Sequence, residues 1–368
     1  MKLQGVELRR VDMPLVSPFR TSFGVEAARD VLLVHVVTAD ADGWGECVAG
    51  SAPLYSSEYI NAAADVTRRF LGPALAAADS LDSAAVEPLL QRFRGHRMAK
   101  AALEAAVLDA ELRAAGVPLA RHLGAVRDRV PCGVSVGIMD SIGQLLEAVA
   151  AYLDAGYLRI KLKIEPGWDV EPLAAVRERF GDDLLLQVDA NTAYTLGDAR
   201  HLAELDRFNL LLVEQPLAED DLLGHAQLAQ TLTTPICLDE SITSARAAAT
   251  AIRLGACAIV NIKAGRVGGL LESRRIHDVC LANGIPVWCG GMLETGVGRA
   301  ANLALAALPG FTLPGDTSAS DRYFSTDLTP PFVLDEGYLE VPTGSGIGVE
   351  PLPDVLEAAT TASEWLAW

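Results

Sequence analysis

The sequence predicts an α/β protein in which a parallel β/α barrel is combined with an α+β domain, and three observations indicate this fold. From about residue 130, short apolar runs alternate with amphipathic stretches in units of about 25 residues, the length of a strand, a helix and two loops. Five successive apolar runs end in a charged residue, namely Lys163, Asp189, Glu214, Asp239 and Lys263. Before residue 126 the order differs, because strand-like runs come first and helix-like runs follow.

Residues 1–125 are expected to form the α+β domain. The predicted strands are residues 6–15 and 31–38, where apolar residues run together or alternate. The predicted helices are residues 57–70, 83–93 and 98–115. Residues 320–368 again have the character of irregular strands, and we expect them to return and complete this domain.

Residues 126–319 are expected to form the barrel. Its predicted strands are residues 132–138, 158–163, 184–189, 210–214, 235–239, 259–263, 286–290 and 312–316. The predicted helices between them include residues 170–180, 245–254 and 270–283. Strands of this number and kind close naturally as a parallel barrel, and an open doubly wound sheet is the alternative.

The composition argues against several classes of protein, namely nucleic-acid-binding, membrane-bound, secreted and zinc-finger proteins. The net charge of −18 lacks the basic footprint of a nucleic-acid-binding protein. No apolar stretch is long enough to span a bilayer, and the N-terminus lacks the apolar core of a secretory signal, so we expect a cytoplasmic protein that does not bind membranes. The six cysteines lack zinc-finger spacing and are expected to be reduced and buried.

Three acids in the middle of the barrel sequence predict a divalent metal site. Asp189, Glu214 and Asp239 end consecutive predicted strands, where barrel enzymes keep their active sites. Carboxylates without sulfur or imidazole favour Mg²⁺, with Mn²⁺ or another divalent cation as the alternative. Each acid alone would equally fit a strand-end residue that caps the next helix. Glu240 would point away from Asp239, so we expect it to support the metal ligands from outside.

Lys161 and Lys163 are predicted to lie on one face of a strand, because side chains on a strand alternate. Their mutual repulsion and their burial are expected to lower their pKa values toward the range where a neutral amine acts as a base. A solvated basic strand end is the alternative, which the apolar neighbours Ile160 and Leu162 disfavour. In a closed barrel, Lys263 would face Lys163 across the mouth, so that two bases reach a substrate from opposite sides.

Further residues are candidates for substrate binding. They are Ser135, Asn191, Phe19, Phe23, Tyr55, Gly291 and Met292. Some have a plainer alternative, since Ser135 would also fill space in the barrel, Asn191 would also turn a loop, and Phe23 would also suit an ordinary core. Arg266, three residues after Lys263, either tunes that lysine or supports its loop.

Five short segments resemble motifs of the enolase superfamily, in particular its muconate-lactonising-enzyme-like branch. They are Lys161-Leu162-Lys163, Asp189-Ala190-Asn191, Glu214-Gln215-Pro216, Asp239-Glu240-Ser241 and Asn261-Ile262-Lys263. Nearly the whole chain is similar to the N-acylamino acid racemases and the o-succinylbenzoate synthases of that branch. The resemblance implies a (β/α)7β barrel beneath an N-terminal capping domain, with Mg²⁺ on the three acids. It also implies that Lys163 and Lys263 form the acid/base pair and that Lys161 assists them.

These expectations define a hypothesis for the reaction. A carboxylate substrate loses the proton on its α-carbon, and the metal stabilises the resulting enediolate. The first alternative is racemisation of N-acylamino acids, in particular N-succinylamino acids; the second is o-succinylbenzoate synthesis, and the third is a muconate-type cycloisomerisation. The single acid Asp316 at the last predicted strand argues against a dipeptide epimerase, which the resemblance associates with an acidic pair there.

Two further expectations concern partners and the class of protein. The expected partners are a small carboxylate substrate and further copies of the chain in a homo-oligomer, with no nucleic acid. A non-catalytic carboxylate-binding protein on the same fold is the rival from another class, because a fold does not guarantee an activity.

Overall fold

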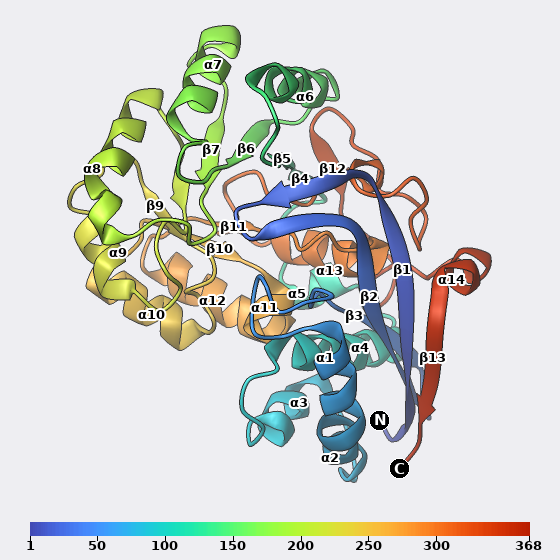
Figure 1. The fold of residues 1–368 in the computed structure, drawn as a ribbon. Helices are drawn as coiled ribbons and strands as arrows, with labels where there is room; N and C mark the ends of the chain where they lie inside the picture. Colours follow the sequence, from blue (N-terminus) through green and yellow to red (C-terminus); the bar gives the residue numbers. More distant parts are fainter.

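Two β-sheets organise the protein, whose computed structural model describes residues 1–368 (Figure 1). A four-stranded antiparallel sheet has the order β13-β1-β2-β3, and a seven-stranded parallel sheet has the order β11-β10-β9-β8-β7-β6-β5. Figure 1 shows the parallel strands curled around a common centre with helices outside them. The predicted combination of a barrel with an α+β cap is therefore confirmed. None of the helices combines the length and the apolar character needed to cross a membrane.

The antiparallel sheet is built around a hairpin longer than predicted. Its strands are β1 (Leu3–Thr21), β2 (Gly24–Thr38), β3 (Asp42–Cys47) and β13 (Thr360–Leu366). The register of β1 against β2 shifts between Pro14 and Phe19. Proline has no N–H to donate to the ladder, so this irregular stretch hid the continuation of β1 from pattern reasoning. β13 pairs antiparallel with β1, so the end of the chain lies in the N-terminal sheet.

Helices follow β3 in the chain, and the longest of them packs against the sheet. They are α1 (Ile60–Val66), a π-helical turn (Thr67–Leu71), α2 (Gly72–Ala76), α3 (Ser83–Leu90), α4 (Arg97–Ala115) and α5 (Leu119–Leu123). The backbone of β3 lies directly against α4, because Gly43 and Gly45 carry no side chain. A Cβ added to Gly45 would lie 2.0 Å from the carbonyl oxygen of Ala102. This close contact joins the sheet and its longest helix into one cap.

The barrel alternates strands and helices nearly as predicted. Its strands are β5 (Gly133–Val136), β6 (Arg159–Lys163), β7 (Leu186–Asp189), β8 (Val213–Glu214), β9 (Ile236–Leu238), β10 (Ile259–Ile262) and β11 (Val287–Cys289). Its helices are α6 (Ile142–Asp154), α7 (Val170–Phe180), α8 (Ala199–Leu202), α9 (Leu222–Leu228), α10 (Ala245–Leu254), α11 (Ala264–Val267), α12 (Leu270–Ala282) and α13 (Gly296–Ala306). The two-stranded sheet of β4 (Arg129–Pro131) and β12 (Tyr338–Glu340) and the helix α14 (Pro353–Ala359) complete the chain.

The prediction of a regular eighth strand over residues 312–316 is wrong. The segment makes only isolated parallel bridges, from Phe311 to Val287 and from Gly315 to Cys132. Pro314 interrupts any continuous ladder because it has no N–H. The two bridges nevertheless reach β11 at one edge and the start of β5 at the other. The segment therefore closes the barrel, and the alternative of an open doubly wound sheet is excluded.

Two buried carboxylates of the cap hold the N-termini of barrel helices. Glu104 of α4 accepts hydrogen bonds from the backbone N–H groups of Leu270 and Leu271, each at 2.9 Å, where α12 begins. Glu46 of β3 accepts from the Thr295 hydroxyl at 2.7 Å and from the Gly298 N–H at 3.0 Å, where α13 begins. Free N–H groups at a helix start favour an acceptor with negative charge. These contacts fix the cap over the barrel.

The stability of the folded protein is expected to fall as the pH rises from 4.5 to 7, because Glu104 is buried. Burial raises the pKa of Glu104 to about 7, against 4.5 for an exposed glutamate. The folded protein then binds a proton that the unfolded chain has lost, so stability falls across this range by up to about 3 kcal/mol. Glu104→Gln removes this titration. Urea unfolding at pH 5, 6, 7 and 8 should show that the free energy of unfolding of the variant rises relative to that of the wild type as the pH rises. A difference between the two free energies that stays constant with pH would contradict this.

Candidate active site

The charged residues predicted to lie together meet at one end of the barrel. Lys163, Asp189 and Glu214 end β6, β7 and β8, while Asp239 and Lys263 directly follow β9 and β10. Parallel pairing places Lys163 beside Asp189 and Asp189 beside Glu214. The three acids are 0 % exposed. The regular spacing in the sequence thus corresponds to one charged residue at the carboxyl end of each successive strand.

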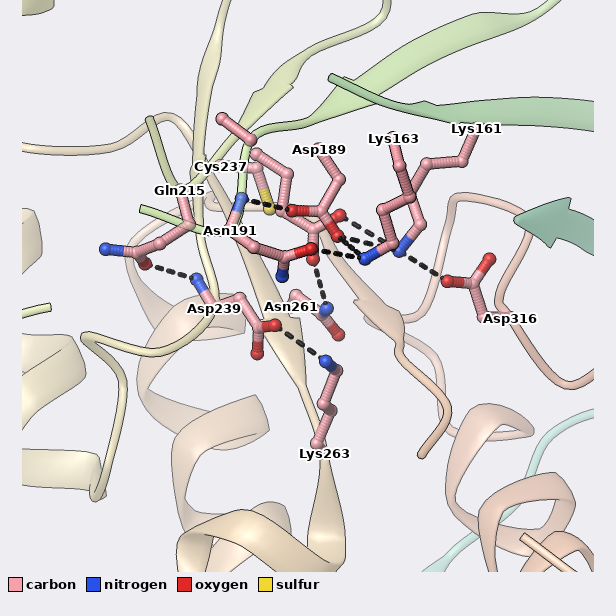
Figure 2. Close-up of polar contacts among 12 residues, drawn as sticks. Lys161, Lys163, Asp189, Asn191, Gln215, Cys237, Asp239, Asn261, Lys263 and Asp316 are labelled. Carbon is pink, nitrogen blue, oxygen red and sulfur yellow. Dashed lines mark hydrogen bonds and ion pairs between the residues drawn. The ribbon is translucent and has the colours of Figure 1, made fainter. Parts of the chain in front are cut away.

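On one side of this cluster, two lysines of β6 hold carboxylates of the neighbouring strands (Figure 2). Lys163 Nζ lies 2.6 Å from Asp189 Oδ2 and donates to Asn191 Oδ1 at 2.7 Å. Lys161 Nζ lies 3.1 Å from Glu214 Oε2 and 3.4 Å from Asp189 Oδ2. The shared face predicted for the two lysines is therefore the face that looks into the barrel.

On the other side, Lys263 Nζ lies 2.7 Å from Asp239 Oδ2 and donates to the Tyr55 hydroxyl at 3.2 Å. Figure 2 shows Lys163 and Lys263 reaching toward the acids from opposite sides. In the sheet, β7, β8 and β9 separate the strands that carry these lysines. The structure thus places one lysine on each side of the barrel mouth, which is the predicted arrangement.

The pKa values of the three acids are shifted in different directions. Burial would raise the pKa of Asp189 and of Asp239, but the ammonium groups of Lys163 and Lys263 outweigh it and hold both pKa values below the usual range. Burial and the nearby Asp189 carboxylate raise the pKa of Glu214 to about 8. Glu214 therefore lacks enough positive charge around it, and a cation between the acids would supply it.

The predicted lowering of the lysine pKa is wrong for Lys161, and Lys263 has a raised pKa as well. Burial does lower the pKa of Lys161, but the carboxylates of Asp316 and Glu214 raise it by more. Burial likewise lowers the pKa of Lys263, and the Asp239 carboxylate reverses this effect. Pattern reasoning counted the repulsion between lysines and left out the acids that would pair with them. A cation bound to Glu214 and Asp239 would weaken this stabilisation of the two ammonium groups.

The donor set suits a hard divalent cation in its chemistry, although the side chains do not stand as a finished metal site. No group of three or more His, Cys, Asp and Glu residues is arranged to hold a metal ion. Asp239 Oδ1 is buried without a hydrogen bond, while Arg266 Nη2 lies 2.9 Å away as an ion pair. The oxygens that a cation would take now face ammonium groups. Asp189, Glu214 and Asp239 stay the predicted ligands.

A pocket of about 140 Å³ lies against the lysines where the cap meets the barrel. Its wall includes Lys161, Lys163 and Lys263 together with every residue predicted to bind substrate: Phe19, Phe23, Tyr55, Ser135, Asn191, Gly291 and Met292. Phe23 packs on Tyr55 with ring centroids 5.7 Å apart. Ser135 Oγ is buried without a hydrogen-bond partner, so the hydroxyl is free to contact a ligand. The cap and the barrel thus both contribute to one pocket.

Arg266 and Glu240 support the site from behind the predicted ligands. Arg266 Nη1 donates to the backbone carbonyl of Ile242 at 2.5 Å, and its other end pairs with Asp239. The arginine therefore braces the loop after β9. Glu240 Oε1 accepts from Asn191 Nδ2 at 2.9 Å. Glu240 thus orients Asn191, the amide that accepts from Lys163.

Sequence reasoning missed three residues of the cluster. Asn261 Nδ2 donates to Glu214 Oε1 at 2.7 Å. Asp316 forms ion pairs with both Arg159 and Lys161. A signal was present in each case, because Asn261 and Arg159 stand two residues before a lysine on the same strand face, and Asp316 is the only acid of the last predicted strand.

Backbone strain gathers at these strand ends. Asn191 and Gln215 have positive φ angles of 41° and 37°, in the region that favours glycine. The Gln215 side chain accepts from the backbone N–H groups of Asp239 at 3.0 Å and Ser241 at 3.2 Å. Strained residues persist where surrounding contacts fix them, and they concentrate at functional sites. Gln215 therefore helps to fix the position of Asp239.

Comparison with known proteins adds to this geometry. Residues 144–355 match the family model described as enolase C-terminal domain-like, and residues 4–124 match the mandelate racemase / muconate lactonizing enzyme N-terminal domain. The chain is 69% identical over 366 residues to an N-succinylamino acid racemase of an Amycolatopsis species, covering 100% of both chains. It is 47% identical over 352 residues to an o-succinylbenzoate synthase of Geobacillus kaustophilus, covering 95% and 94%. A crystal structure of an enolase superfamily member from Listeria innocua has a TM-score of 0.95 at 40% identity, with 100% and 99% coverage.

Proposed function

The chain belongs to the mandelate racemase / muconate lactonizing enzyme family and is an enzyme of the enolase superfamily, and we propose that it removes the proton α to a carboxylate. We further propose that it racemises N-succinylamino acids. The observation that carries the proposal is the pair Lys163 and Lys263, which reach one pocket from opposite sides. A single base would suffice for exchange on one face, whereas inversion at carbon needs a group on each face.

The proposed reaction assigns complementary tasks to the two lysines. The neutral amine of Lys163 takes the α-proton from one enantiomer, and the ammonium of Lys263 delivers a proton to the opposite face. The reverse reaction exchanges the two roles. A lysine without its proton must be available at the start, so the carboxylates that now pair with both lysines have to be engaged elsewhere. Asp189, Glu214 and Asp239 would hold Mg²⁺, which when bound would offset the negative charge that develops on the substrate carboxylate.

The pocket offers further contacts for such a substrate. Lys161 lies on the wall beside Lys163 and would pair with the substrate carboxylate. Ser135, whose hydroxyl has no protein partner, would accept or donate one hydrogen bond. Phe19, Phe23 and Met292 supply apolar surface from the cap and the barrel, which fits an acyl chain or an amino acid side chain.

o-Succinylbenzoate synthesis is the second candidate function. Its support is the 47% identity to a synthase over nearly the whole chain. Loss of water from the precursor also begins with removal of a proton α to a carboxylate. The second lysine then only stabilises the anion electrostatically. The cluster therefore serves both reactions, and the 69% identity to a racemase favours racemisation as the main one.

The test is to incubate each enantiomer of N-succinylphenylalanine in D₂O with the Mg²⁺-loaded protein. We expect deuterium to enter at the α-carbon, which ¹H NMR detects as loss of the α-proton signal. We also expect the other enantiomer to appear, which chiral chromatography detects. The same protein is then given the cyclohexadiene precursor of o-succinylbenzoate. Absence of α-exchange together with turnover of the precursor would contradict racemisation and establish the synthase. Absence of both reactions would contradict the proposed proton removal.

A further inference from the structure

A buried chain of ion pairs reaches the pocket wall, where Lys161 and Asp316 both lie. Arg159 Nη1 lies 2.8 Å from Asp316 Oδ1, and Asp316 Oδ2 lies 2.5 Å from Lys161 Nζ. The ring of Trp288 covers both cations, with its centroid 5.3 Å from Arg159 Cζ and 4.8 Å from Lys161 Nζ. Asp316 is thus enclosed between two cations and is shielded from bulk water.

Arg159 is fixed in place, and it fixes the Asp316 carboxylate. Its Nη2 donates to the Pro314 carbonyl at 2.8 Å, in the segment that closes the barrel. Gly133 leaves room for the guanidinium, because a Cβ there would lie 2.3 Å from Arg159 Cζ. The backbone N–H of Asp316 donates to the Cys289 carbonyl at 2.8 Å. The acid is therefore held from its backbone and from one carboxylate oxygen, leaving the other oxygen for Lys161.

Three carboxylates compete for the Lys161 ammonium. Asp316 is nearest at 2.5 Å, followed by Glu214 at 3.1 Å and Asp189 at 3.4 Å. Figure 2 shows Asp316 on the side of Lys161 away from Asp189. The latter two carboxylates are predicted metal ligands, whereas Asp316 is not. The closer the Lys161 ammonium lies to Asp316, the weaker are its ion pairs with Glu214 and Asp189.

We propose that Asp316, held by Arg159, is a positioning residue that draws the Lys161 ammonium away from Glu214 and Asp189. The two carboxylates are thereby left for a divalent cation, and the ammonium is kept at the pocket wall for the substrate carboxylate. This inference rests on the proposed function, since it assumes that Glu214 and Asp189 bind Mg²⁺. Without the charge of Asp316, the ammonium moves toward those two acids and competes with the cation.

The test measures Mg²⁺ binding by titration calorimetry in the absence of substrate. Asp316→Asn keeps the side-chain shape and removes the charge. We expect its dissociation constant for Mg²⁺ to rise about tenfold, the usual scale for a group that orients a ligand. In the Lys161→Met background the same substitution should leave Mg²⁺ affinity unchanged, because no ammonium is left to compete. In the exchange assay at saturating Mg²⁺, KM of Asp316→Asn should rise by more than kcat falls, because the ammonium that pairs with the substrate carboxylate has left the pocket wall.

Asp327→Asn is the matched control. Asp327 is equally buried, but its carboxylate accepts from the Gly296 N–H and the Ser320 hydroxyl and does not line the pocket. Three results would each overturn this inference and leave the proposed function standing. The first is unchanged Mg²⁺ affinity in Asp316→Asn, and the second is an equal loss of Mg²⁺ affinity when the substitution is made in the Lys161→Met background. The third is an equal loss of Mg²⁺ affinity in Asp327→Asn. Failure of the wild type to bind Mg²⁺ would overturn the proposed function together with it.

Discussion

Replacing Lys163 or Lys263 by alanine is expected to abolish racemisation in both directions, with a loss of at least about 10³-fold in kcat. A positioned acid or base contributes about 10²–10⁴-fold to a proton transfer. Both lysines line the same pocket, and each enantiomer needs both of them, one to take the proton and one to return it. Chiral chromatography of the product from each N-succinylphenylalanine enantiomer measures the loss.

Lys100→Ala is the control for this pair. Lys100 lies on the cap helix α4, where its ammonium donates to the Phe93 carbonyl, and it does not line the pocket. Its removal should leave kcat within a factor of two. Circular dichroism of all three variants checks that they are folded. Wild-type racemisation by either pocket variant would refute the two-base scheme.

Removing divalent cations is expected to stop the reaction completely, and Mg²⁺ or Mn²⁺ should restore it. The physical reason is that burial and the neighbouring Asp189 carboxylate disfavour the charged form of Glu214 and raise its pKa to about 8, and a bound cation would offset both effects. Glu214→Gln keeps the size and one side-chain oxygen but removes the charge, so its Mg²⁺ affinity should fall by at least about 10²-fold. The measurements are activity after chelation and titration calorimetry of the metal.

Glu219→Gln is the matched control for this substitution, because Glu219 lies on the loop that follows Glu214 and is exposed. Its Mg²⁺ affinity should equal that of the wild type. Full activity of thoroughly chelated protein would contradict the metal assignment, as would equal effects of the two glutamine variants.

Much of the fold could be predicted from local patterns. The helices over residues 170–180 and 245–254 were predicted with the bounds they have, since each pairs an apolar stripe with a glycine at its C-terminus. The strand ends that carry the acids were also predictable, because each acid directly follows an apolar run. In the periodic part of the chain, local patterns were therefore enough to predict the strands and helices.

The remainder depends on contacts that no local pattern reveals. The tip of the β1–β2 hairpin was missed because Pro14 breaks the alternation, and residues 312–316 failed to form a ladder because Pro314 lacks an N–H. The raised pKa of Lys161 arises from Asp316, which is more than 150 residues away in sequence. Distances between such partners follow from the closure of the barrel, which is a property of the whole chain.

The central claim is that the two lysines act on opposite faces of one carbon, and enantiomer-resolved deuterium exchange in the single variants tests it most directly. Each variant is incubated in D₂O with the pure enantiomers of N-succinylphenylalanine, and the α-proton signal is followed by ¹H NMR. The account predicts that Lys163→Ala still exchanges one enantiomer, Lys263→Ala exchanges only the other, and neither forms the opposite enantiomer. Exchange of the same enantiomer by both variants would contradict it.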